Sequence, residues 1–209
     1  MVRACPGESE GPTRQAQAAL IHTPEPREDT LMTRRRTLLT TPSPRDQVDF
    51  LEAVRRSRAL HRPWAYPPST PERYATWLAR LDTERNASWL VRRRDDDALV
   101  GVINLNEIVG GSFLSGYLGY YAFRGQERQG LMHEGLSDVL AEVFGPRKLH
   151  RVEANIQPEN EASIALVQGL GFRQEGYSPR YLKIGGRWRD HERWALLAED
   201  WRLRSRTRA

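Results

Sequence analysis

The stretch 118–132, LGYYAFRGQERQGLM, decides how the rest of the sequence is interpreted. Its aromatic first part, within 116–123, predicts a β-strand. A polar loop, 124–129, follows and leads into a predicted helix that runs from about Gly130 to Phe144. The start of a helix offers free N–H groups and a positive dipole end, which suit a pyrophosphate, and Gly130 lets the phosphate approach closely. Alone this evidence is weak, because the loop is neither a Walker loop nor G-x-G-x-x-G.

Strands and helices extend outward from this stretch on both sides. Pro residues after Ser43 and Thr70 are typical of helix starts, and apolar residues recur at helical spacing from Tyr74 to Leu81. The paired glycines 185–186 indicate a hairpin. We expect helices over 44–58, 71–81, 130–144 and 160–169, and strands over 37–41, 88–94, 98–106, 116–123, 149–156, 181–184 and 187–197. The mixture predicts an α/β fold.

The length of 209 residues favours one domain with an appendage. Residues 1–31 have the composition of a disordered extension, residues 32–201 form the expected domain, and residues 202–209 are a basic tail expected to fray. Met1 and Met32 both remain candidate starts. The single cysteine excludes a disulfide framework and a cysteine-based zinc site. The longest uncharged stretch, 108–123, is too short for a transmembrane helix, so no membrane partner is expected.

The chain carries a net charge of +5, and nearly all of its basic residues are arginine. Such a bias reflects either the nucleotide composition of the genome or an affinity for a polyanion or a phosphate-bearing cofactor. The histidines show no metal-ligand spacing, so no metal is expected.

The stretch 118–132 resembles the cofactor loop of the GNAT N-acetyltransferases, and Asn160-Glu161-Ala162-Ser163 with Leu170-Gly171-Phe172 resembles their second signature. Arg62-Pro63-Trp64 and the run from Gly186 to His191, GRWRDH, are similar to the ribosomal-protein-alanine N-acetyltransferases, the RimJ/RimL branch. The resemblance covers Thr37 to Trp201. It implies a GNAT fold with a mixed central sheet of six to seven strands and flanking helices, acetyl-CoA as the donor, and an amine acceptor.

The resemblance also implies which residues hold acetyl-CoA: Tyr121, Ala122, Phe123, Arg128, Gln129, Gly130, Leu131, Met132, Asn155, Asn160 and Ser163. A backbone N–H from 121–123 is expected to meet the oxyanion. Three positions depart from the family. Glu127 puts a carboxylate beside the pyrophosphate, so we expect weaker binding, with Arg124 or Arg128 neutralising that charge. Asn155 stands where many members have a Glu base, and Val167 where many have a Tyr acid.

Transfer of an acetyl group to an amine requires a neutral amine. An α-amino group with a pKa of about 7.7–8 needs only a modest base. Glu107 and Glu153 are the candidate bases; the alternatives are a solvated Glu107 and a Glu153 that pairs with an arginine. Ser163 is the candidate hydrogen-bond donor to the leaving sulfur, or simply a serine at a helix start.

On the acceptor side the candidates are Trp64 and Asp190. The alternative for Trp64 is an aromatic residue that caps the core, and the alternative for Asp190 is a carboxylate that stabilises the hairpin. Asn160 either contacts acetyl-CoA or is only the N-cap residue of its helix. The first functional hypothesis is acetylation of a protein N-terminal α-amino group, such as that of a ribosomal protein, in the cytoplasm. The ribosome's RNA would attract the arginine-rich surface. The second is acetylation of a small amine, an antibiotic or a polyamine. The third is a weakly catalytic module that binds acyl-CoA or nucleic acid. The oligomeric state stays open.

Overall fold

The computed structural model describes residues 35–82 and 84–207. They form one seven-stranded sheet in the order β1-β2-β3-β4-β5-β7-β6. The strands are β1 (Thr37–Thr40), β2 (Ala87–Arg93), β3 (Leu99–Val109), β4 (Ser115–Ala122), β5 (Arg151–Ile156), β6 (Arg173–Ile184) and β7 (Arg187–Leu197). The pairing of β4 with β5 is parallel and every other pairing is antiparallel. The predicted α/β fold with a mixed central sheet is therefore confirmed.

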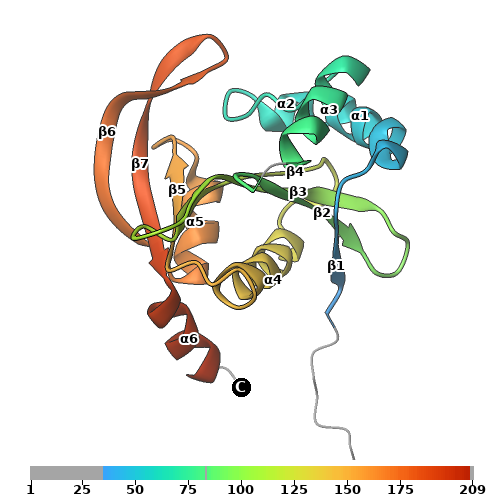
Figure 1. Ribbon diagram of the computed structural model, residues 1–209. Helices are drawn as coiled ribbons and strands as arrows, with labels where there is room; N and C mark the ends of the chain where they lie inside the picture. The colour runs from blue at the N-terminus through green and yellow to red at the C-terminus, as the bar shows by residue number, and fades with distance from the viewer. Residues whose placement is uncertain (1–34, 83, 208–209) are drawn as a thin grey trace, which may run out of the picture. The chain divides into compact units, whose positions relative to one another are not determined.

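Helices cover both faces of this sheet (Figure 1). One face carries α1 (Gln47–Arg56), α2 (Arg58–His61) and α3 (Pro71–Ala79), and the other carries α4 (Leu131–Phe144) and α5 (Glu161–Leu170). Short 3-10 turns, Pro44–Asp46 and Arg80–Asp82, flank this first group, and α6 (Ala198–Thr207) follows β7. Ser43 and Thr70 are N-cap residues with proline in the first turn, as their sequence context predicted.

Each face has its own core. The larger core joins apolar residues of β2, β3, β4, β5 and β7 to α4 and α5, with Leu136, Val139 and Leu140 fully buried. The smaller core packs Phe50 of α1 and Tyr74 of α3 against Leu90, Val102 and Phe123. Burial of this much apolar surface fixes which side of each strand faces which helix layer.

The pairing between β4 and β5 stops early. Residues Ser115–Leu118 pair with Arg151–Ala154, and no pairing joins the remaining residues of the two strands. Gly119–Ala122 and Asn155–Ile156 therefore border a gap in the ladder, called the β4–β5 gap below.

Several predicted boundaries are wrong. The helix expected over 44–58 breaks at Ser57, where α1 ends and α2 begins. β6 begins at Arg173, eight residues before the expected 181. The tail expected to fray from Arg202 lies inside α6, where Arg202 Nη2 donates to the carbonyl of Phe144 at 3.3 Å. The extension 1–31 and Met32 lie outside the described residues.

Candidate active site

The main chain at the end of β4 presents one N–H group to the β4–β5 gap. Phe123 N–H donates to Val100 O at 2.8 Å, so it belongs to the pairing with β3. Because successive residues of a strand direct their polar groups to opposite sides, Tyr121 N–H also faces β3 and Ala122 N–H faces the gap. Of the three oxyanion donors expected over 121–123, Phe123 is excluded by its bond to Val100, and Ala122 is the candidate.

The helices on one face hold the end of β4 in place. His61 of α2 is 4% exposed, and its Nε2 donates to Ala122 O at 2.8 Å. Burial lowers the pKa of His61, which favours the neutral ring. Ser57 Oγ accepts from Arg124 N–H at 2.9 Å. These contacts fix the point at which β4 leaves the sheet and the loop 124–130 begins.

The loop ends at the open start of α4. Gly130 is the N-cap residue with φ of 76°, a left-handed conformation that glycine adopts without strain. The first intrahelical bond runs from Glu134 N–H to Gly130 O at 3.1 Å. The N–H groups of Leu131, Met132 and His133 therefore have no acceptor within the helix. This arrangement fits the phosphates of acetyl-CoA.

Side chains of the loop contribute unequally. Leu131 is buried in the larger core and Met132 packs against it, so these two offer main-chain groups only. Arg128 is exposed, with φ of 60°. Gln129 Nε2 donates to Gly125 O at 2.8 Å and closes the loop on itself.

Glu127 has a different partner from the one expected. Its Oε2 accepts from Gly125 N–H at 2.6 Å. No ion pair joins it to Arg124 or Arg128 in the part of the chain that the structure describes, so neutralisation by either arginine stays a prediction. The carboxylate takes up a loop N–H group instead.

A pair of hydroxyl groups links α5 to β4. Ser163 Oγ donates to the hydroxyl oxygen of Tyr120 at 2.7 Å, and that hydroxyl lies 3.3 Å from Ser163 O. Asn160 is the N-cap residue of α5, and its side chain accepts from Ser163 N–H at 3.3 Å. Asn155 Oδ1, at the gap, is buried without a partner. Val167 is fully buried in the larger core, so nothing replaces the missing tyrosine hydroxyl at that position.

Both candidate bases are held by arginines. Glu153 accepts from Arg151 Nε at 2.8 Å, and Arg151 also makes two hydrogen bonds to Glu175 of β6. Glu107, 51% exposed, pairs with Arg85 at the end of the sheet where β4 begins, away from the gap. Both carboxylates are thus engaged in ion pairs, and either would have to leave its arginine to accept a proton from the amine.

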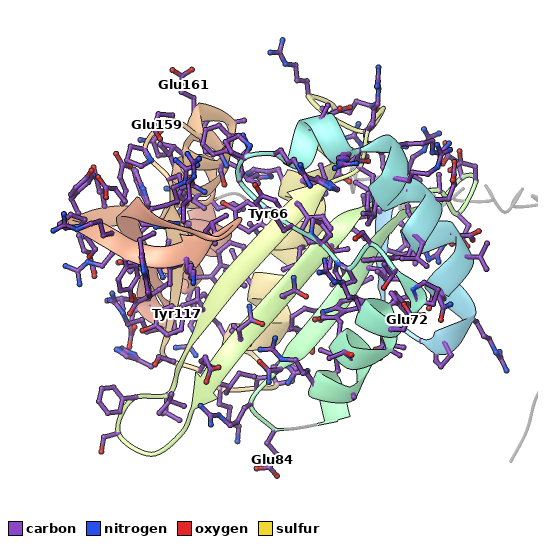
Figure 2. All side chains as sticks on the ribbon, turned by 90° about the horizontal axis from the view of Figure 1, so that it is seen from above. Tyr66, Glu72, Glu84, Tyr117, Glu159 and Glu161 are labelled. Atoms are coloured by element: carbon purple, nitrogen blue, oxygen red, sulfur yellow. The ribbon has the colours of Figure 1, made fainter. Side chains whose placement is uncertain are left out.

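The expected acceptor residues are placed as follows. Trp64 is half-buried in the loop after α2, and its carbonyl oxygen lies 3.5 Å from Gln157 Nε2, just past β5. Tyr66, labelled in Figure 2, belongs to the same loop and abuts Gly185 at the hairpin tip. Asp190 accepts from Tyr177 OH at 2.6 Å and from Arg180 N–H at 2.7 Å. Both oxygens are thus occupied within the hairpin, which favours its stabilising role.

Sequence reasoning missed four residues that shape this site: Arg36, His61, Tyr120 and Gln157. Tyr120 lies in the decisive stretch, but only the fold shows that it faces α5. Among the residues that the structure describes, no group of three or more His, Cys, Asp or Glu is placed to hold a metal ion. Within the same residues no helix is long and apolar enough to span a membrane.

Comparisons with known proteins agree with this geometry. The [ribosomal protein uS5]-alanine N-acetyltransferase of Escherichia coli is 40% identical over 107 residues, 51% of this chain and 55% of that protein. The chain thus aligns with about half the length of that relative. A Bacillus subtilis protein named probable N-acetyltransferase YjcK is 30% identical over 129 residues, 62% of this chain and 71% of that protein.

Solved structures share the fold. Mycobacterium smegmatis RimJ in complex with CoA-disulfide is 26% identical with a TM-score of 0.72, covering 78% of this chain and 82% of that one. Spermidine N-acetyltransferase from Vibrio cholerae in complex with CoA and spermine, 18% identical over 79% of this chain and 98% of that one with a TM-score of 0.69, shows the fold alone. Residues 36–173 match the family described as "Acetyltransferase (GNAT) domain". The chain therefore belongs to this family of GNAT acetyltransferase domains.

Proposed function

We propose that this protein is an acetyl-CoA-dependent N-acetyltransferase and that its acceptor is the N-terminal α-amino group of a protein, such as a ribosomal protein. Family membership, the open start of α4 and the β4–β5 gap support the donor. The relative from Escherichia coli, whose name specifies the alanine of a ribosomal protein, supports the acceptor.

One observation carries the choice of a protein acceptor over a polyamine. The carboxylates of Glu153, Glu175 and Asp190, which β5, β6 and β7 contribute, already have partners in Arg151, Tyr177 and the main chain. A polyamine carries several ammonium groups, and each needs an unpaired carboxylate to offset the cost of leaving water. A single α-amino group, partly neutral near pH 7.7–8, has no such need.

The residues at the gap perform the transfer as follows. Acetyl-CoA would supply an activated acetyl group, and the N–H groups of Leu131, Met132 and His133 at the start of α4 would hold its phosphates. Ala122 N–H donates to the carbonyl oxygen as negative charge develops there. The neutral amine forms a bond to the carbonyl carbon, the carbon–sulfur bond breaks, and the amine proton passes to solvent. Ser163 Oγ turns from Tyr120 to donate to the departing sulfur.

The proposed setting is the cytoplasm, where ribosomes and acetyl-CoA occur together. The net charge of +5 favours encounter with a ribosome, whose RNA makes it negative, over encounter with a free basic protein. This part of the proposal predicts that association with ribosomes weakens as the salt concentration rises.

The test is intact-mass detection of acetylation with acetyl-CoA. Its acceptors are a set of peptides that differ in their first residue, the same peptides with a blocked α-amino group, spermidine and an aminoglycoside. We expect a gain of one acetyl group only on peptides with a free terminus. Faster acetylation of spermidine or the aminoglycoside overturns the protein acceptor. CoA binding without any product favours a weakly catalytic binding module.

A further inference from the structure

Arg36, the residue before β1, is bonded directly to the cofactor loop. Its Nη2 donates to Gln129 O at 2.9 Å. Its main-chain N–H donates to Glu134 Oε2 at 3.0 Å, and its Nε donates to Glu134 Oε1 at 2.7 Å. One residue therefore joins the last residue of the loop to the first turn of α4.

The bond to Gln129 O orients the peptide group between Gln129 and Gly130. In a trans peptide the carbonyl and the N–H point in opposite directions. Because Arg36 holds the carbonyl, Gly130 N–H is directed away from the guanidinium. A Cβ atom at Gly130 would lie 3.4 Å from Arg36 Nη2, so the guanidinium sits against the N-cap residue itself.

Arg36 is itself held by the sheet. Arg94 N–H donates to Arg36 O at 2.9 Å, and Arg94 Nε donates to Thr37 O at 2.9 Å. The main chain at Arg36 is therefore held by the edge of the sheet, and the guanidinium connects this edge to Gln129 and Glu134. Since Glu134 neutralises its charge, Arg36 acts on the loop through geometry more than through net charge.

We propose that Arg36 is a positioning residue for the phosphates of acetyl-CoA: it fixes the Gln129–Gly130 peptide and the first turn of α4 so that their N–H groups converge on the pyrophosphate. This inference rests on the donor named in the proposed function. Without Arg36 the same N–H groups would still be present, but they would no longer be held in the direction of the pyrophosphate.

The chain offers a matched control in Arg35. Arg35 pairs with Asp138, one turn further along α4, and carries the same charge on a side chain that is 52% exposed, against 55% for Arg36. It makes no described contact with the loop. Arg35→Ala therefore removes one positive charge and one ion pair to α4 without releasing Gln129 O.

The experiment measures binding by the full-length protein without any acceptor. CoA is titrated calorimetrically, and pantetheine, which lacks the phosphates, is titrated at millimolar concentration by NMR. Loss of the aligned contacts to a charged ligand is expected to raise the Kd of CoA about tenfold in Arg36→Ala. Arg36→Lys keeps the charge but replaces the planar guanidinium, whose Nε and Nη2 both bond Glu134, by a single ammonium nitrogen, so it should fall between Arg36→Ala and the wild type. Arg35→Ala should bind CoA like the wild type.

Each outcome of this experiment either supports or overturns the role proposed for Arg36. An unchanged Kd for CoA in folded Arg36→Ala overturns the proposal, and so does an equal loss in Arg35→Ala, which would indicate a general charge effect. Equal weakening of pantetheine overturns it as well, because the phosphates would not be the point of action. If Arg36→Ala does not fold, Arg36→Lys decides by the same comparison. Absence of CoA binding by the wild type defeats the proposed function itself.

Discussion

The hydroxyl group of Ser163 donates a 2.7 Å hydrogen bond to the hydroxyl oxygen of Tyr120, and so joins the first turn of α5 to β4 beside the β4–β5 gap. Burial raises the pKa of Tyr120 far above its ordinary value, so this phenol stays protonated. It can therefore donate to Ser163 Oγ when the serine turns to another acceptor. The pair is suited to stabilising a thiolate through hydrogen bonds, with Ser163 in contact and Tyr120 behind it.

Ser163→Ala is expected to lower kcat about a hundredfold and leave the KM for acetyl-CoA nearly unchanged, as loss of a donor to developing charge does. Steady-state kinetics with a peptide acceptor that has a free α-amino group measures both constants. Ser137→Ala, a serine in α4, is the control and should behave like the wild type. A full kcat in Ser163→Ala would assign the serine to the helix start alone.

Gly130→Glu is expected to abolish the rise in melting temperature that acetyl-CoA causes in the wild type. The substitution forces a side chain onto a residue with φ of 76° and adds a negative charge at the phosphate position. Gly111→Glu, at φ of 62° with open space around it, adds the same strain and charge in the β3–β4 loop. Differential scanning fluorimetry compares the two, and an unchanged shift in Gly130→Glu would remove the loop from the cofactor site.

Glu153→Gln and Glu107→Gln are expected to keep the rise of rate with pH that follows the α-amino group, with a pKa of about 7.7–8. Both carboxylates are paired with arginines, so neither needs to accept the proton. The measurement is kcat/KM from pH 6 to 9.5 for each variant. Flattening of the profile in one variant would identify that carboxylate as the general base.

Lowering the pH below about 6.5 is expected to reduce the free energy of unfolding. His61 and His191 are buried, and burial lowers the pKa of each below the ordinary 6.5. The unfolded chain therefore binds protons that the folded chain excludes, and the stability is lost as the pH falls from 6.5 toward the folded values. Urea unfolding at pH 7.5 and 5.5 should show a smaller loss in His61→Gln than in the wild type.

Deletion of residues 1–31 is expected to leave the melting temperature and CoA binding unchanged, because that composition offers little to pack on a core. Deletion of residues 1–36 also removes Arg36 and should weaken CoA binding. Loss of soluble protein in the shorter deletion would show that the extension contributes to folding.

The sequence predicted those helices and strands whose ends are marked by a short local pattern of residues. The proline after Ser43 or Thr70 and the apolar stripe from Tyr74 place two helices, and Gly185–Gly186 places the hairpin. The start of β6 was not predicted, and the segment concerned contains Gly176 and Pro179, residue types that are disfavoured inside a strand. In the structure both lie at register shifts, where a strand tolerates such residues.

Only those parts of the candidate site that lie within one continuous sequence motif could be predicted from the sequence. The loop and Gly130 follow from the stretch 118–132, whereas Arg36 acts on that loop from 93 residues away. No spacing rule links the two positions. The arginine partner of Glu153 was foreseen only as an alternative, and that of Glu107 was not foreseen, since a carboxylate in a base role and one in an ion pair look alike in sequence.

The short parallel pairing of β4 with β5 has a mechanical consequence. The strand pairing between the two parts of the sheet is confined to Ser115–Leu118 and Arg151–Ala154, and Leu114 O just before it accepts from His150 N–H and Arg151 N–H. The core beneath α4 and α5 spans both parts, while the core beneath α1 and α3 belongs to β2–β4 and their flanks alone. The two parts of the sheet are therefore joined along one face by a continuous core, and on the other face by contacts of the loop after α2 with Gln157 and Gly185. A ligand that lies in the β4–β5 gap and contacts both strands stabilises the closed arrangement of the sheet. Separation of β5–β7 from the rest of the sheet then costs the binding free energy of that ligand as well.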